Sequence, residues 1–183
     1  MEYDITLVQQ TIFFSGLSSF EIKQIFEGCA SVTDVAQGDK IIEEGTVDDN
    51  IYFLPEGKVQ VELETNNLYN HQLTEIKGPT VFGEMSFLDK SPRSATVKAL
   101  GNFEIYIING RYLDELLMEM PNTGYKISRN IACSLSKILR RSTEMISREI
   151  ERNQLLHDKA AQLAVHKYKA TLSNIVHYIN QSA

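Results

Sequence analysis

The stretch FGEMSFLDKSPRSATVKA, residues 82–99, carries the most distinctive chemistry of this sequence. It begins with a glycine–glutamate pair, continues as a short amphipathic run, and places an arginine at the entrance to an alternating strand. The glycine lets the backbone approach a ligand closely. A helix that starts here would offer the free amides of Glu84, Met85 and Ser86 to an anion. Arg93 adds a guanidinium fork that fits phosphate oxygens.

The other polar groups of this stretch narrow the class of ligand. Ser94 adds a hydroxyl, and the amide of Ala95 adds a donor. Backbone amides with one arginine suit a phosphodiester of single charge, whereas triphosphate sites usually use a lysine and a metal ion. The Glu84 carboxylate would repel a phosphate, so it should face neutral hydroxyls such as a ribose 2′-OH. A 3′,5′-cyclic nucleotide satisfies these requirements together. Taken singly, Arg93 could instead form a surface salt bridge with Glu84 or Asp89.

The whole sequence has the composition of an ordinary globular protein. Its 183 residues, 43% hydrophobic and 23% charged, suit one domain or one domain with an appendage. No apolar run approaches the roughly 18 residues that a membrane span needs, and the acidic start shows no signal-peptide pattern. Cys29 and Cys133 have no metal-like or redox-like spacing. We therefore expect a cytoplasmic protein that does not cross a membrane.

The charge is distributed unevenly along the chain. Residues 1–120 carry a balance of −12, whereas residues 121–183 carry +6, so that the net charge is −6. A solvated helix face is the plain explanation of the basic end. An acidic partner, nucleic acid included, is the alternative.

The hydrophobic pattern predicts a β-rich region followed by helices. A helix is expected over residues 18–28, and short alternating runs then continue to residue 109, about seven or eight strands in all. In KVQVELE, Val59 and Val61 point to one face. This density of strands favours a double-sheet roll or barrel over a parallel α/β sheet. A short helix over GRYLDELLMEM should end at Pro121, with a break in Asn-Thr-Gly.

The remaining sequence predicts a long helix. Residues 125–157 contain neither proline nor glycine. An apolar stripe at 3.6 residues per turn comprises Ile127, Ile131, Leu135, Ile138, Leu139, Ser142, Met145, Ile146 and Leu156. Much of it should meet a second copy in a short coiled coil, although a tail folded back as a local hairpin is the alternative. A further helix over residues 159–179, with Leu163, Leu172, Ile175, Val176 and Ile179, is expected to follow.

Residues 82–97 resemble the phosphate-binding cassette of the cyclic nucleotide-binding domain family. The family pattern is Phe-Gly-Glu, a short helix, Pro-Arg with a small residue, then Ala-Thr-Val, and all of it is present here. The long helix resembles the dimer helix of the Crp/Fnr relatives of the catabolite activator. The resemblance implies an α+β fold: a jelly-roll, or double-stranded β-helix, with flanking helices and a long C-terminal dimerisation helix. The implied parts are a nucleotide-binding domain over 12–120, a dimer helix over 121–157 and a helical tail over 158–183.

The resemblance also implies roles for particular residues. Glu84 would hold the ribose hydroxyl, while Arg93 and Ser94 would hold the cyclic phosphate. The other expected ligand-binding residues are Gly83, Met85, Ser86 and Ala95 of the cassette, Val59 and Val61 as an apolar wall, and Ser142 and Thr143 at the adenine edge. The last pair lies in LRRSTEMI, where hydroxyls could equally face solvent or bond back to the preceding turn. Cyclic AMP is favoured over cyclic GMP, because serine stands where a guanine-holding threonine is usual.

Three departures from the regulators of this family limit the expected function. No helix-turn-helix can be drawn after residue 157, so nucleic acid is not the favoured partner. The cysteine cluster of the iron–sulfur branch is missing, and KGPT replaces the usual acidic Gly-Asp before the cassette. We therefore expect a cyclic nucleotide sensor that acts as a homodimer towards an unknown protein partner.

Other functions remain as alternatives to the sensor. The chain could be an interaction scaffold with a vestigial pocket that works through its basic tail, or the sensor part of a Crp/Fnr transcription regulator. An enzyme is not expected, and neither are a metal ion or a catalytic residue. The histidines His71, His157, His166 and His177 are scattered, and no nucleophile has a base beside it.

Overall fold

The computed structural model describes residues 3–64 and 70–181, with side chains omitted at 64, 70–73, 157, 160, 161 and 164–181. The chain forms two compact units, Met1–Ser134 and Leu135–Ala183. The first unit contains both sheets and the shorter helices. The second consists of the greater part of one helix.

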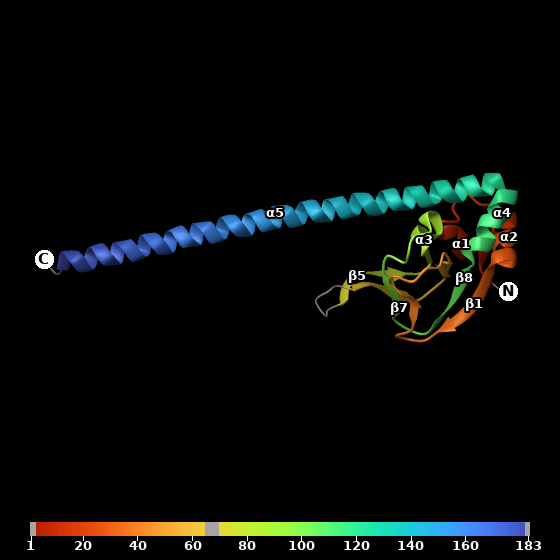
Figure 1. The fold of residues 1–183 in the computed structure, drawn as a ribbon, viewed down its shortest axis with the longest axis horizontal. Helices are drawn as coiled ribbons and strands as arrows, with labels where there is room; N and C mark the ends of the chain where they lie inside the picture. Colours follow the sequence, from red (N-terminus) through yellow and green to blue (C-terminus); the bar gives the residue numbers. More distant parts are fainter. Residues whose placement is uncertain (1–2, 65–69, 182–183) are drawn as a thin grey trace. The chain divides into compact units, whose positions relative to one another are not determined.

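Two four-stranded antiparallel sheets form the body of the first unit (Figure 1). One sheet has the order β1-β8-β3-β6 and the other the order β2-β7-β4-β5. The strands are β1 (Ala30–Val35), β2 (Lys40–Ile42), β3 (Ile51–Leu54), β4 (Lys58–Glu64), β5 (Asn70–Lys77), β6 (Thr80–Phe82), β7 (Thr96–Ala99) and β8 (Phe103–Ile108). The helices are α1 (Ile5–Gln10), α2 (Ser19–Cys29), α3 (Glu84–Asp89), α4 (Gly110–Glu119) and α5 (Pro121–Gln181). The predicted α+β roll with flanking helices and a long C-terminal helix is confirmed.

The core has one part inside the roll, of aliphatic and aromatic residues, and a second, aromatic part beneath the helices. Inside the roll, buried residues of both sheets pack together, among them Leu54, Val59 and Ile105. Outside it, Phe26 of α2 contacts Phe53 of β3 with ring centroids 5.9 Å apart. The roll therefore buries both faces of β3, which explains why all four of its residues are buried.

A buried carboxylate joins α2 to the start of α5. Ser18 and Glu21 form the capping box expected of the serines before this helix. The same Glu21 carboxylate accepts hydrogen bonds from Lys126 Nζ at 2.9 and 3.0 Å and from Thr123 Oγ1 at 2.7 Å. Burial raises the pKa of Glu21, but the bonds from Lys126, Ser18 and Thr123 outweigh it and lower the pKa to about 2.

The junction between α4 and α5 differs from the sequence expectation. Pro121 and the Asn-Thr-Gly that follows do not form a break but the first turn of α5. Proline is well tolerated at the first helical position, because its missing N–H has no partner there in any helix. Residues 159–179, predicted as a further helix, belong to α5 itself. The side chains of Leu172, Ile175, Val176 and Ile179 lie outside the described residues.

We expect Glu21→Gln to destabilise the protein by about 1–3 kcal/mol at neutral pH, because it removes a charge-assisted network while leaving Lys126 in place. The Glu21 pKa is lowered on folding, so its stabilising contribution is present above the unfolded-state pKa of 4.5. That contribution is lost as the pH falls towards the folded value of about 2. Urea unfolding of both proteins at pH 7 and pH 2.5 should show the difference shrinking at low pH. A difference independent of pH would contradict this assignment.

Candidate functional site

The cassette opens with a glycine that the local geometry requires. Gly83 follows β6, has φ +87°, and is the N-cap of α3. A Cβ atom at this position would lie 2.9 Å from Arg93 Nη1 and 3.0 Å from the Asn50 carbonyl oxygen. Both the backbone conformation and the space therefore exclude a larger side chain. The predicted short helix is present as α3 (Glu84–Asp89).

Arg93 is buried, with 3% of its surface exposed, and the protein itself supplies its acceptors. Its Nε donates to Asp48 Oδ2 at 2.9 Å, and its Nη2 donates to Asp48 Oδ1 and, at 2.7 Å, to the Asn50 carbonyl. Its Nη1 donates to the Gly83 carbonyl at 3.1 Å. A guanidinium has five N–H donors. One N–H is therefore left over by these bonds.

This arrangement decides what an incoming anion would meet. The hydrogen bond from Arg93 lowers the pKa of Asp48, although burial opposes that shift, so the pair is ionised near neutral pH. A phosphate could use the remaining N–H of Arg93 or displace the Asp48 carboxylate from the fork. Either way it would approach a carboxylate of like charge, which costs binding free energy.

Tyr52 holds the other side of the guanidinium. The Arg93 Cζ atom lies 5.6 Å from the centroid of the Tyr52 ring, within the range of a cation–π contact. The Tyr52 ring stacks on Phe82 with centroids 5.4 Å apart. Since Tyr52 and Phe82 are paired across β3 and β6, the sheet itself fixes the arginine.

Glu84 lines a small cavity at one side of the cassette. The cavity, of about 200 Å³, is also lined by Thr11, Thr80, Asn130 and Ser134, which come from the N-terminal segment, β6 and α5. Burial raises the pKa of Glu84, and the nearby Arg93 lowers it to a smaller extent. Glu84 thus shares this cavity with neutral hydroxyl and amide groups. Its expected role at a ribose hydroxyl stays a prediction.

The other predicted cassette residues differ in their accessibility. Met85 is 48% exposed, and its Sδ lies 3.9 Å from the Ser94 Oγ, which is also exposed. Ala95 is half-buried, whereas Ser86 is buried. A ligand on this surface can therefore reach Met85, Ser94 and Ala95 directly.

The predicted apolar wall lies on β4. Val59 is fully buried in the core of the roll, and Val61 packs against that core while remaining half-buried. Val61 is paired with Val97 of β7. Only Val61 of the two has surface that a ligand could cover.

Ser142 and Thr143 belong to the second unit and are exposed. The Thr143 Oγ1 donates to the Leu139 carbonyl at 3.0 Å, which is the bond back to the preceding turn. The role of both residues at an adenine edge stays a prediction.

Comparison with known proteins agrees with this geometry. The family model described as cyclic nucleotide-binding domain matches residues 32–120. The chain therefore carries a cyclic nucleotide-binding domain. The family predicted from the cassette is confirmed.

The relatives of this domain belong to proteins of several kinds. A cAMP-dependent protein kinase regulatory subunit of Mucor circinelloides f. lusitanicus is 26% identical over 110 residues, which are 60% of this chain and 25% of that protein. The chain spans less than a third of the length of the curated relatives it matches, 25% and 29%.

Solved structures share the fold of the domain. The catabolite activator protein of Thermus thermophilus has a TM-score of 0.65 and 24% identity, covering 74% of this chain and 62% of that one. The regulatory subunit of a cAMP-independent protein kinase A from Trypanosoma brucei has a TM-score of 0.57 and 24% identity, covering 73% of this chain and 50% of that one.

The loop that supplies the acceptors of Arg93 was not predicted from the sequence. Asp48 and Asn50 lie more than 40 residues before Arg93, in GTVDDNIYF, and no local pattern connects the two segments. The signal present was a cluster of acidic residues directly before a fully apolar strand. Such clusters are common in turns, so the cluster alone did not indicate a partner for the arginine.

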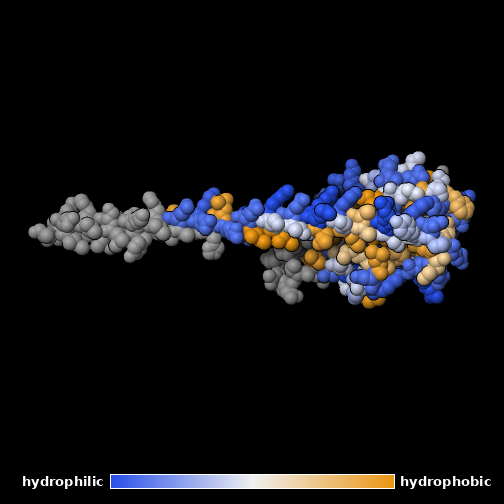
Figure 2. Space-filling model, turned by 90° about the horizontal axis from the view of Figure 1, so that it is seen from above, coloured by the Kyte–Doolittle hydropathy of each residue, from blue (hydrophilic) through white to orange (hydrophobic). Residues whose placement is uncertain are grey.

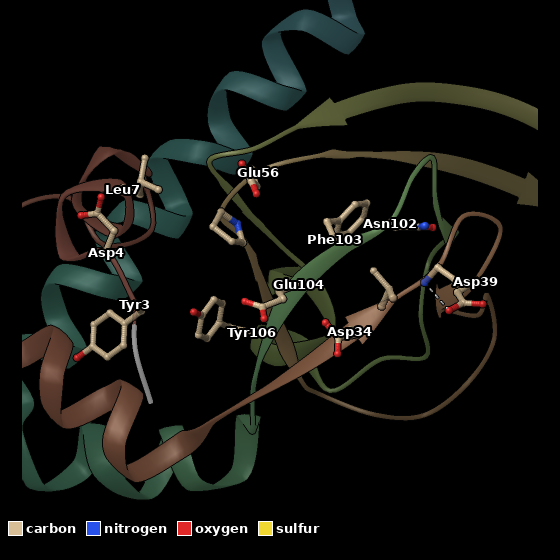
Figure 3. Close-up of a pocket in the computed structure, with 13 residues that line it drawn as sticks. Tyr3, Asp4, Leu7, Asp34, Asp39, Glu56, Asn102, Phe103, Glu104 and Tyr106 are labelled. Carbon is tan, nitrogen blue, oxygen red and sulfur yellow. Dashed lines mark hydrogen bonds between the residues drawn. The ribbon is translucent and has the colours of Figure 1, made fainter.

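A second cavity lies away from the cassette. It measures about 940 Å³ and is lined by five acids, Asp4, Asp34, Asp39, Glu56 and Glu104. Figure 3 shows these carboxylates around the rings of Phe103 and Tyr106. No lysine or arginine is among its lining residues in the described ranges. This acidic surface would repel a cyclic phosphate.

Two further properties concern only the described residues. None of their helices is long and apolar enough to span a membrane. No group of three His, Cys, Asp or Glu among them could hold a metal ion. The side chains of His71, His157, His166 and His177 lie outside this description.

We expect Gly83→Ala to destabilise the domain by about 1–3 kcal/mol, because alanine is strained at φ +87° and its Cβ would displace Arg93. Gly101→Ala is the matched control, since Gly101 lacks a positive φ and a Cβ there would meet nothing within 4 Å. Thermal and urea unfolding should separate the two variants. Equal stabilities would contradict the geometry assigned to the cassette.

Proposed function

We propose that this protein is a sensor that binds a cyclic nucleotide at the cassette and has no catalytic activity of its own. The observation that carries this proposal is the cassette itself: Gly83 caps α3 without a side-chain hydrogen bond, Arg93 donates to the Gly83 carbonyl, and Glu84 lines a cavity with neutral polar groups. A phosphodiester would meet the amides, Ser94 and Arg93, while ribose hydroxyls would meet Glu84. The other contacts would come from Met85, Ser86, Ala95 and Val61.

We favour cyclic AMP as the ligand over cyclic GMP. Ser94 follows the arginine, where a threonine would help to hold guanine, and a relative at 26% identity is named a cAMP-dependent regulatory subunit. The Trypanosoma brucei structure with the same fold is described as cAMP-independent, so the fold does not by itself decide the ligand. The purine has to be determined by experiment.

The second unit supports a homodimer. Its stripe of apolar side chains is exposed, with Leu139 67%, Met145 67% and Ile146 61% accessible. The opposite face carries Lys137, Arg141, Glu144, Arg148 and Glu151. Figure 2 shows hydrophobic side chains gathered along one edge of this helix and hydrophilic ones along the other. A second copy would cover such a stripe in a coiled coil. An unidentified protein partner would then respond to the dimer.

A specific observation favours a second function, that of an interaction scaffold. Four N–H groups of Arg93 already have acceptors in the protein, so its burial is stable without any phosphate. In that case the basic end of the chain, residues 121–183, would bind the partner of the scaffold. The chain could also be the sensor part of a larger Crp/Fnr regulator, with nucleic acid bound by another part.

Thermal unfolding with cyclic AMP, cyclic GMP and plain AMP tests the sensor. A ligand at 100 times its dissociation constant adds about 2.7 kcal/mol and raises the melting temperature. We expect a rise with cyclic AMP and none with AMP. Glu84→Gln should reduce the rise, because amides make weaker bonds to ribose hydroxyls than a carboxylate does. If no cyclic nucleotide raises the melting temperature, the scaffold is the better account.

Substitution within the apolar stripe tests the homodimer. We expect Ile146→Glu to yield monomers, since a dimer would bury this charge without a partner. Ser147→Glu adds the same charge about 100° around the helix and should leave the dimer intact. Light scattering after size-exclusion chromatography measures the mass. A monomeric parent protein would refute the dimer directly.

A further inference from the structure

Lys90 occupies an unusual position at the end of the cassette helix. It is the C-cap of α3 and has φ +55°, the only positive φ of a non-glycine residue in the described ranges. Its Nζ lies 2.8 Å from Asp49 Oδ2 and 2.6 Å from Asp114 Oδ2, and 4.7 Å from the centroid of the Phe87 ring. A lysine in this conformation is disfavoured, so its contacts must offset the cost. One ammonium group thus joins α3, the loop before β3 and α4.

A second contact joins the same loop to α4. Gly110, the first residue of α4, lies so close to Asp49 that a Cβ atom would come 2.2 Å from the Asp49 carbonyl oxygen. The loop therefore packs directly on the backbone of α4, in addition to its link through Lys90.

The loop also holds the arginine of the nucleotide site. Asp48 and Asn50, on either side of Asp49, both accept hydrogen bonds from Arg93. Three consecutive residues therefore contact the phosphate-binding arginine, the end of the cassette helix and α4. A displacement of the Asp48 backbone would also shift Asp49, because adjacent Cα atoms are separated by a fixed 3.8 Å.

We propose that Lys90, Asp49 and Asp114 form an ionic latch that keeps the loop and α4 in the arrangement where Asp48 occupies Arg93, and so opposes nucleotide binding. The inference rests on the proposed function, because it describes regulation of the same site. Nucleotide phosphate competes with Asp48 for Arg93, and the latch supports Asp48. Nucleotide binding would then weaken the ion pairs of the latch, and breaking those ion pairs would strengthen nucleotide binding by the same factor, because coupling between two sites is reciprocal.

The exposure of the three latch side chains determines how strongly the latch can affect nucleotide affinity. The side chains of Lys90, Asp49 and Asp114 are 49%, 29% and 44% exposed, so solvent and salt screen their attraction. Exposed pairs contribute little individually, and the latch should change nucleotide affinity by about two- to fivefold. A weak latch suits a regulatory contact, because the ligand can open it.

Asp114→Asn tests the latch by a substitution outside the proposed nucleotide site. Asp114 lies in α4 and is not among the residues placed at the nucleotide. We expect this variant to bind cyclic AMP about two- to fivefold more tightly than the parent, measured by titration calorimetry at fixed salt. Glu115→Gln is the matched control. Glu115 is the residue next to Asp114 in α4, and it also forms an exposed ion pair, with Arg111 Nε at 3.2 Å. Unchanged or weaker binding by Asp114→Asn, relative to this control, overturns the proposal.

A second measurement needs no nucleotide. Asp48→Asn and Asp114→Asn, singly and together, form a double-mutant cycle for urea unfolding. If the latch supports Asp48, the two shifts of the unfolding midpoint will not add, since both substitutions act on one network. Additive shifts overturn the latch. Absence of binding by the parent protein would instead refute the proposed function, and the cycle would still decide whether the latch exists.

Discussion

The rest of the cassette depends on one constraint, the burial of a permanently charged guanidinium. A buried arginine must have its donors satisfied, because an uncompensated charge in the interior costs several kcal/mol. Here the acceptors come from Asp48, Asn50 and Gly83, and the face of the guanidinium lies near Tyr52. These contacts determine where the loop before β3 runs and why no side chain fits at residue 83. The same bonds that stabilise the fold also hold the group that a phosphate would need.

If a phosphate binds at Arg93 as proposed, stability and ligand binding would compete for the same guanidinium. If the Arg93 guanidinium had no protein acceptor, its buried charge would need a ligand to compensate it. With Asp48 as its partner, the guanidinium is stable without a ligand. The acid must then share or yield the arginine when an anion binds. The domain can adjust its affinity through residues that touch neither ligand nor arginine, provided that they move the loop. Distance from the nucleotide is therefore a poor guide to which residues affect it.

Much of this site could be predicted from the sequence because its parts are close together in the chain. Residues 82–97 contain the glycine, the short helix, the arginine and the following strand, and local rules place each of them. The number of strands and the roll could also be predicted, from the alternation of apolar and polar residues along short segments. The partner of Arg93 could not be predicted, since Asp48 meets it only through long-range contacts. These are the pairing of β3 with β6 and two backbone hydrogen bonds, from Gly45 N to the Arg93 carbonyl and from Arg93 N to the Thr46 carbonyl. The start of α5 at Pro121 was also missed, because a proline can follow the end of one helix or stand in the first turn of the next.

The start of α5 provides a second connection to the cassette, independent of α4. Glu21 and Lys126 fix the first turns of the helix to α2, and Asn130 donates to the carbonyls of Phe13 and Ser15. The same Asn130 lines the cavity that contains Glu84. A hydroxyl-bearing group placed against Glu84 would therefore meet a helix that is already anchored on both sides. Asn130 thus connects the cavity beside Glu84 to the N-terminal segment through the carbonyls of Phe13 and Ser15.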